Sequence, residues 1–181
     1  MTHAIVLSAT VALLLASAAA AQAPIETRGA WRLVPDGEDF ALRTEARDAP
    51  DSTFSLYCRK AQGRYVFEIK SPALAARASG EEIRISFKVD DDDQTWLNLS
   101  TGPDGTVPIS HQTAYWIIHG ALTRSGAKSV AFTAADRGWQ FPLDGLRELT
   151  DRLVERCGFA PPRPGPERRR EPLPPDPLPK Q

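Results

Sequence analysis

A strict alternation of apolar and polar residues constrains the fold of this chain more than any other feature. Between residues 83 and 89 every second residue is apolar, and the residues between them are Arg84, Ser86 and Lys88. Side chains of an extended strand point alternately to its two faces, so this pattern is typical of a half-buried β-strand. Similar short apolar runs predict further strands at 31–34, 40–43, 54–58, 65–69, 96–99 and 107–109.

Turn-forming residues separate these predicted strands. Asp-Gly or Gln-Gly pairs stand at 36–37 and 62–63, four aspartates at 90–93, and Pro-Asp-Gly at 103–105. Short strands joined by short turns favour antiparallel pairing. The sequence therefore predicts an antiparallel sheet over most of the chain.

Two later segments change to the period of an α-helix. Apolar residues spaced by three and four predict an amphipathic helix over 114–122 that ends at Gly126. The last helix begins after Asp144, a candidate N-cap, and ends at Gly158, a candidate left-handed C-cap, with Phe159 folding back on it. Its apolar stripe consists of Leu146, Leu149, Thr150, Leu153, Val154 and Cys157.

A hairpin is expected between the two helices. Its arms alternate at 130–132 and 139–143, and Asp-Arg-Gly at 136–138 makes the turn. Pro142 lacks a backbone donor, so its strand should end there or lie at a sheet edge. Together these elements predict an α+β fold: one antiparallel β-rich, sandwich-like domain with two helices.

The two ends of the chain differ from this domain. Residues 4–21 are almost wholly apolar and close on three alanines before Gln22, which predicts a signal peptide over 1–21 and a mature domain over 22–159. The start lacks Lys and Arg, and the alternative is an uncleaved membrane anchor. No other membrane contact is expected.

Residues 160–181 carry nine prolines and little apolar surface. Such a composition predicts a disordered tail with much polyproline II character. The alternative is a semi-rigid spacer or a docking peptide, because 172–175 has PxxP spacing.

The two cysteines are expected to form a disulfide. Cys58 lies on the apolar face of a predicted strand, and Cys157 lies on the apolar stripe of the last helix. In exported proteins such cysteine pairs are usually oxidised to disulfides. Here the disulfide would tie the last helix to an early strand. The alternative is a redox or catalytic thiol, but no CxxC pair is present.

Charge and metal-binding patterns point to no cofactor. Lys plus Arg number 22 and Asp plus Glu 23, so no basic face is expected for nucleic acid. The aspartates at 90–93 read as a solvated turn, with calcium binding as the alternative. His111 and His119 read as surface or capping residues, because a zinc site needs further ligands.

The chain carries no motif that selects a catalytic set. GxSxG, SxxK, HExxH and phosphate-binding loops are all missing from the sequence, so it is not expected to be an enzyme. The tryptophans fill the core or line a ligand groove; they are Trp31, Trp96, Trp116 and Trp139.

An ordered series of core and turn residues resembles a known family. The series comprises Trp31, Leu56-Tyr57-Cys58, Phe87-Lys88-Val89-Asp90, a helix, and Phe141-Pro142-Leu143-Asp144-Gly145-Leu146 followed by Leu153 and Cys157. It resembles the VasI-type proteins associated with type VI secretion and, more loosely, the invasion-associated locus B family. The resemblance implies a small, non-enzymatic periplasmic protein of a Gram-negative bacterium, and it transfers no catalytic residue.

Three functions follow from these patterns, in order of preference. The first is a non-catalytic periplasmic or secreted protein that binds a protein or cell-envelope partner. The second is a small-ligand or carbohydrate-binding module, which requires Trp96 or Trp116 to be accessible in a groove. The third is a hydrolase, which requires a cleft that brings His111 or His119 near a serine and a carboxylate.

Overall fold

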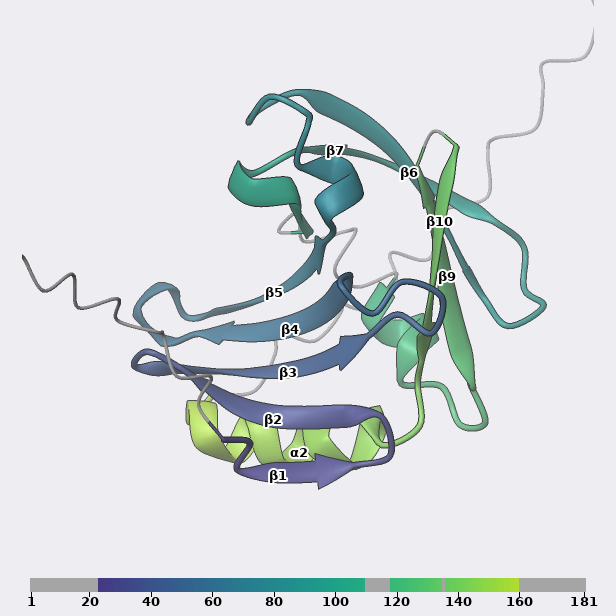
Figure 1. Ribbon diagram of the computed structural model, residues 1–181. Helices are drawn as coiled ribbons and strands as arrows, with labels where there is room; N and C mark the ends of the chain where they lie inside the picture. Colours follow the sequence, from purple (N-terminus) through teal and green to yellow (C-terminus); the bar gives the residue numbers. More distant parts are fainter. Residues whose placement is uncertain (1–22, 110–117, 135, 160–181) are drawn as a thin grey trace, which may run out of the picture.

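Two antiparallel sheets and a C-terminal helix make up the described part of the chain. A computed structural model describes residues 23–109, 118–134 and 136–159. The strands of the two sheets cross at a steep angle, and the last helix lies along the first sheet (Figure 1). This arrangement confirms the predicted α+β fold with antiparallel strands and a helix tied to an early strand.

The six-stranded sheet contains most of the N-terminal half of the domain. Its strands lie in the order β1 (Glu26–Arg28), β2 (Trp31–Asp36), β3 (Asp39–Glu45), β4 (Thr53–Arg59), β5 (Arg64–Lys70) and β8 (Thr106–Ile109). Short 3-10 turns follow several strands: η1 (Lys60–Gln62), η2 (Pro72–Leu74) and η3 (Pro103–Gly105). The predicted strands are confirmed here, whereas β1 was not predicted because Glu-Thr-Arg shows no apolar alternation.

The four-stranded sheet packs against the first through its apolar face. Its strands lie in the order β10 (Arg137–Pro142), β9 (Ser129–Ala134), β6 (Glu82–Val89) and β7 (Thr95–Ser100). The apolar residues of the strictly alternating strand β6 are buried, as its period predicts. One aromatic side chain joins the two sheets: the Phe54 ring lies 5.4 Å from that of Phe67, 5.0 Å from Phe132 and 5.5 Å from Phe141.

The β9–β10 hairpin follows the prediction with a shorter turn. Arg137 and Gly138 already belong to β10 and pair with Ala134 and Thr133, so the expected turn at 136–138 is wrong by two residues. Pro142 does lie on an edge strand, as its missing donor requires.

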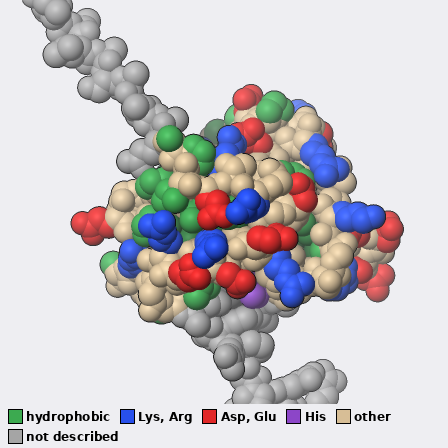
Figure 2. All heavy atoms as spheres, turned by 90° about the horizontal axis from the view of Figure 1, so that it is seen from below, with side chains coloured by type: hydrophobic (Ala, Val, Ile, Leu, Met, Phe, Trp, Pro, Cys, Tyr) green, Lys and Arg blue, Asp and Glu red, His purple; other side chains and the backbone are tan. Residues whose placement is uncertain are grey.

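Helix α2 (Leu146–Cys157) packs on β1 to β4 through the predicted stripe. Gly158 caps its C-terminus in the left-handed region, as expected. Asp144 is not the N-cap: Gly145 occupies that position, and the Asp144 carboxylate instead accepts a hydrogen bond from the Ala30 amide at 3.1 Å. The opposite face of the helix is polar, and Figure 2 shows acidic and basic side chains interspersed over this side of the molecule.

Several sequence predictions fall on residues outside the described ranges. These are the signal peptide at 1–21, the proline-rich tail at 160–181, His111, Trp116 and the first part of the helix expected at 114–122. The described part of that helix, residues 118–122, is helical, and Gly126 beyond it has a positive φ of 86°. Among the described residues, no helix has the length and apolar character needed to cross a membrane.

Candidate functional site

The predicted disulfide joins the two expected cysteines. Cys58 on β4 and Cys157 at the end of α2 are bonded across 99 residues of sequence, with their Cα atoms 6.2 Å apart. Both cysteines are buried. A buried disulfide indicates an oxidising, extracytoplasmic environment.

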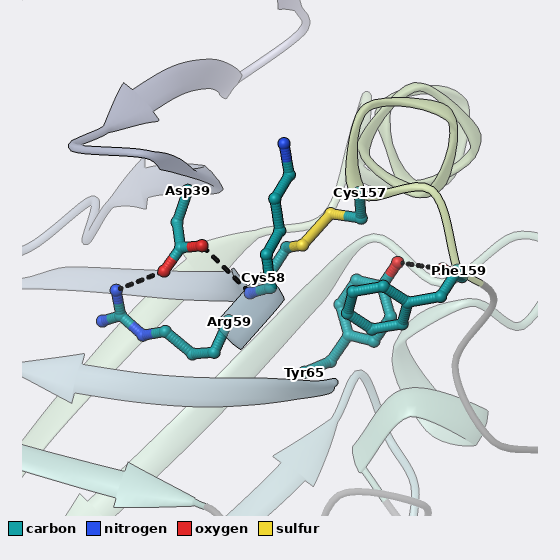
Figure 3. The surroundings of a disulfide bond; sticks show 7 residues. Asp39, Cys58, Arg59, Tyr65, Cys157 and Phe159 are labelled. Carbon is teal, nitrogen blue, oxygen red and sulfur yellow. Dashed lines mark hydrogen bonds and ion pairs between the residues drawn. A yellow bond between two sulfur atoms is a disulfide. The ribbon is translucent and has the colours of Figure 1, made fainter. Parts of the chain in front are cut away.

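A second contact beside the disulfide holds the end of α2 (Figure 3). The Tyr65 hydroxyl on β5 donates a 2.7 Å hydrogen bond to the Phe159 carbonyl oxygen, and the two rings lie 5.1 Å apart. Phe159 thus contacts β5, whereas the sequence predicted that it folds back on the helix. Burial raises the pKa of the Tyr65 hydroxyl to about 12.

This pKa shift predicts that the stability of the protein falls in alkaline solution. The folded state keeps Tyr65 protonated up to about pH 12, whereas the unfolded chain ionises it near pH 10. The stability that protonated Tyr65 contributes to the folded state is therefore fully present below pH 10 and is lost as the pH rises from 10 to 12. Urea unfolding of wild type and Tyr65→Phe across this range measures it. The difference in free energy of unfolding between the two proteins should become smaller as the pH rises. A difference that does not change with pH would contradict the raised pKa of Tyr65.

The outer face of the six-stranded sheet carries a network of charged side chains. Arg43 donates to the Tyr57 hydroxyl at 3.2 Å, and the Arg59 guanidinium lies 4.2 Å above the Tyr57 ring while it pairs with Asp36 at 2.6 Å. Burial raises the pKa of both Tyr57 and the neighbouring Glu68. Because these groups already satisfy one another across the four strands β2 to β5, the network stabilises the sheet.

The first aspartate of the 90–93 run has a structural role. Asp90 adopts a positive φ of 48°, and its carboxylate accepts bonds from the Lys128 amide at 3.0 Å and the Ser129 amide at 2.8 Å. Burial acts to raise the pKa of Asp90, but these hydrogen bonds outweigh it and lower the pKa. Asp92 pairs with Arg124 at 2.7 Å. The described residues contain no group of three or more ligand side chains arranged to hold a metal ion.

His119 lines a cavity of about 320 Å³ together with Thr123, Arg147, Thr150 and Asp151. Burial lowers the pKa of its imidazole. The hydroxyls here belong to threonines, and they donate to backbone carbonyl oxygens of His119 and Leu146. The cavity thus brings together the histidine and the carboxylate of the hydrolase hypothesis, but no serine lines it among the described residues.

The described tryptophans divide into two buried and one exposed. Trp31 is fully buried and Trp139 nearly so, and their indole N–H groups donate to the Pro142 carbonyl and the Ser71 hydroxyl. Trp96 on β7 is 49% exposed, although the Arg84 guanidinium from β6 lies 4.4 Å above its ring.

Trp96 and Arg84 belong to the outward face of the four-stranded sheet. Trp96 pairs across the strands with Ser86, and Arg84 pairs with Asn98. The buried Ser86 hydroxyl accepts a 2.5 Å hydrogen bond from the side-chain amide of Gln94. We call the surface of Arg84, Trp96 and Asn98 the Trp96 face. It presents an aromatic ring, a cation and an amide side by side on two paired strands.

The alternation within β7 carried a signal for this face. Leu97 and Leu99 define the inward side of the strand, so Trp96 and Asn98 must point outward. The prediction that treated the tryptophans as one group did not use this signal. No family model, curated protein or solved structure matches the chain.

Proposed function

We propose that this protein is a non-catalytic binding protein that works in the periplasm or outside a Gram-negative cell. Its partner is a protein or another component of the cell envelope, and this partner binds at the Trp96 face. The observation that carries the proposal is the 49% exposure of Trp96 beneath a stacked arginine.

The chemistry of the Trp96 face favours binding. Tryptophan and arginine are the residue types most enriched among those that dominate binding energy at protein interfaces. An exposed indole loses its contact with water on binding, and the Arg84 guanidinium stacks on the ring. The described chain exposes only one other large apolar side chain, Ile25 at 41%.

The proposed compartment rests on the disulfide and on the N-terminal sequence. The Cys58–Cys157 bridge requires oxidising conditions to form, and the periplasm and the exterior of the cell provide them. The apolar segment at 1–21 supplies the export signal. Membership in the VasI-type proteins stays a prediction of the sequence resemblance.

Substitution of Trp96 tests the proposal. Partners are first captured by a photoreactive residue at Asn98 in living cells, and the purified partner is then titrated against wild type and Trp96→Ala. Loss of one central aromatic contact should weaken binding by about thirtyfold or more. The matched control is Ile25→Ala, which removes the other exposed apolar side chain and should leave the affinity unchanged.

The experiment distinguishes specific binding at the Trp96 face from nonspecific hydrophobic binding. Trp96 contributes little to the core, so Trp96→Ala should unfold at nearly the wild-type denaturant concentration. An unchanged affinity in Trp96→Ala, or equal losses in Trp96→Ala and Ile25→Ala, would contradict the proposal.

A soluble carbohydrate is the second candidate, because a sugar ring stacks on an exposed indole as a protein side chain does. Trp96 is accessible, but this function also requires a groove, and the cavity beside His119 does not include Trp96. Soluble oligosaccharides should then quench the Trp96 fluorescence in wild type and have no effect in Trp96→Phe.

A further inference from the structure

A second cavity, of about 290 Å³, opens at the far edge of the four-stranded sheet from β7. It lies where the β3–β4 connection meets η2 and the start of β10. Its volume is close to the lower end of the range for small-molecule sites, about 300 to 1,000 Å³. The polar residues that line it are Asp48, Asp51, Ser52, Ser71 and Arg137, and Trp139 adds an aromatic wall.

Hydrogen bonds hold the walls of this cavity together. The Gln140 amide on β10 donates to the Asp48 carboxylate at 3.2 Å, and the Arg47 amide donates to the Gln140 carbonyl oxygen at 2.9 Å. The Ser52 amide donates to the Ala49 carbonyl oxygen at 2.8 Å. The β3–β4 connection is therefore fastened to β10, and the cavity is preformed.

The buried Ser71 hydroxyl at the base of the cavity has three neighbours. The Trp139 indole N–H lies 3.1 Å from its Oγ, the Ala73 amide 3.3 Å and the Ser52 Oγ 2.8 Å. The indole and the amide can only donate, so they occupy the two lone pairs of Ser71. Only one proton lies between the two serine oxygens, so one of the two hydroxyl protons of the Ser52–Ser71 pair has no acceptor among the described residues.

This count leaves the Ser52–Ser71 pair with one proton to donate to a ligand, and both serines line the cavity. Ser52 is only 2% exposed, and among the described residues its Oγ has no hydrogen-bond partner besides Ser71. A buried donor that lacks an acceptor is costly. Ser52 lines the cavity, so a molecule bound there with an acceptor atom would satisfy it.

The charges around the cavity are also available to a ligand. Among the described residues neither Asp51 nor Arg137 forms an ion pair, and both are exposed. In a different cavity of about 430 Å³ near β1, the charged residues of the lining are not available, because Arg32 and Glu45 pair with each other. Of these two cavities, the one lined by Ser52 combines a spare hydroxyl donor with unpaired charges of both signs.

We propose that this cavity binds a free zwitterionic α-amino acid. The ligand carboxylate accepts bonds from the Arg137 guanidinium and from the Ser52 hydroxyl. The ligand ammonium group faces the carboxylates of Asp48 and Asp51, and a small side chain packs near Trp139. This site lies apart from the Trp96 face, so failure of either proposal leaves the other standing.

Calorimetric titration of the mature protein with glycine, L-alanine and L-serine tests the proposal. Each probe is compared with a form that lacks one charge: N-acetylglycine has no ammonium group, and glycinamide has no carboxylate. Glucose serves as a neutral polyol. The amino acids should bind at least about tenfold more tightly than all three comparison compounds, because charge-assisted hydrogen bonds are lost in each.

Variants then assign each charge of the ligand to its partner. Arg137→Gln should weaken L-alanine binding about tenfold and leave the weaker glycinamide binding unchanged, whereas Asp51→Asn should weaken both. Both side chains are exposed, so the fold is expected to persist, and Arg64→Gln is a matched control on an exposed arginine outside the cavity. Absence of amino-acid binding, glucose binding of equal strength, or an unaffected Arg137→Gln variant would overturn the proposal.

Discussion

Replacing both cysteines with serine is expected to lower the free energy of unfolding by about 4 to 5 kcal/mol. The bridge closes a loop of 99 residues, and the chain-entropy model assigns about 4.7 kcal/mol to a loop of about 100 residues. Domains of this size are typically stable by only about 5 to 15 kcal/mol, so the loss is a large fraction of the total. Urea unfolding of Cys58→Ser/Cys157→Ser against the oxidised wild type measures it.

Chemical reduction provides the control for this prediction. The reduced wild type keeps both sulfur atoms and loses only the covalent link, so its stability should match that of the double variant. A loss below about 1 kcal/mol in both proteins would show that noncovalent packing alone holds α2 on the sheet.

The second large effect is expected at Phe54. Its ring is fully buried and contacts Trp31, Phe67, Phe132 and Phe141, which come from both sheets. Phe54→Ala should therefore cost about 3 to 5 kcal/mol through lost burial and the cavity that remains. Phe40→Ala is the matched control, because Phe40 is only partly buried at the rim of the core and should cost clearly less.

Two probes of Phe54→Ala unfolding also test whether the sheets form one cooperative unit. Tryptophan fluorescence reports on the packing around the buried Trp31 and Trp139, one in each sheet, whereas far-ultraviolet circular dichroism reports on all strands. One core shared by both sheets predicts that the two transitions coincide. Separate transitions, or a loss below about 1 kcal/mol, would contradict the bridging role of Phe54.

Patterns within single segments predicted most of the secondary structure. The strict alternation at 83–89 placed β6 and its buried face correctly, because period two is a property of the strand itself. The helical stripe before Cys157 and the glycine after it likewise placed α2 and its C-cap. A three-residue strand such as β1 has too few side chains for any period to show.

The start of α2 shows how tertiary contacts override a local preference. Aspartate is favoured at an N-cap, yet Gly145 takes the position with a φ of 87°. A Cβ atom at Gly145 would lie 1.9 Å from the Arg28 carbonyl oxygen, so the close approach of the β1–β2 turn requires glycine there. The same approach brings Asp144 to the Ala30 amide.

The sequence by itself determined the antiparallel strands, the helix period and the pairing of the only two cysteines. Each of these depends on neighbouring residues or on the number of cysteines. Only the tertiary structure decided which strands belong to each sheet, that Trp96 is left uncovered, and that Ser52 and Arg137 line one cavity. Those outcomes depend on which distant segments pack together, and periodicity within one segment holds no information about its distant neighbours.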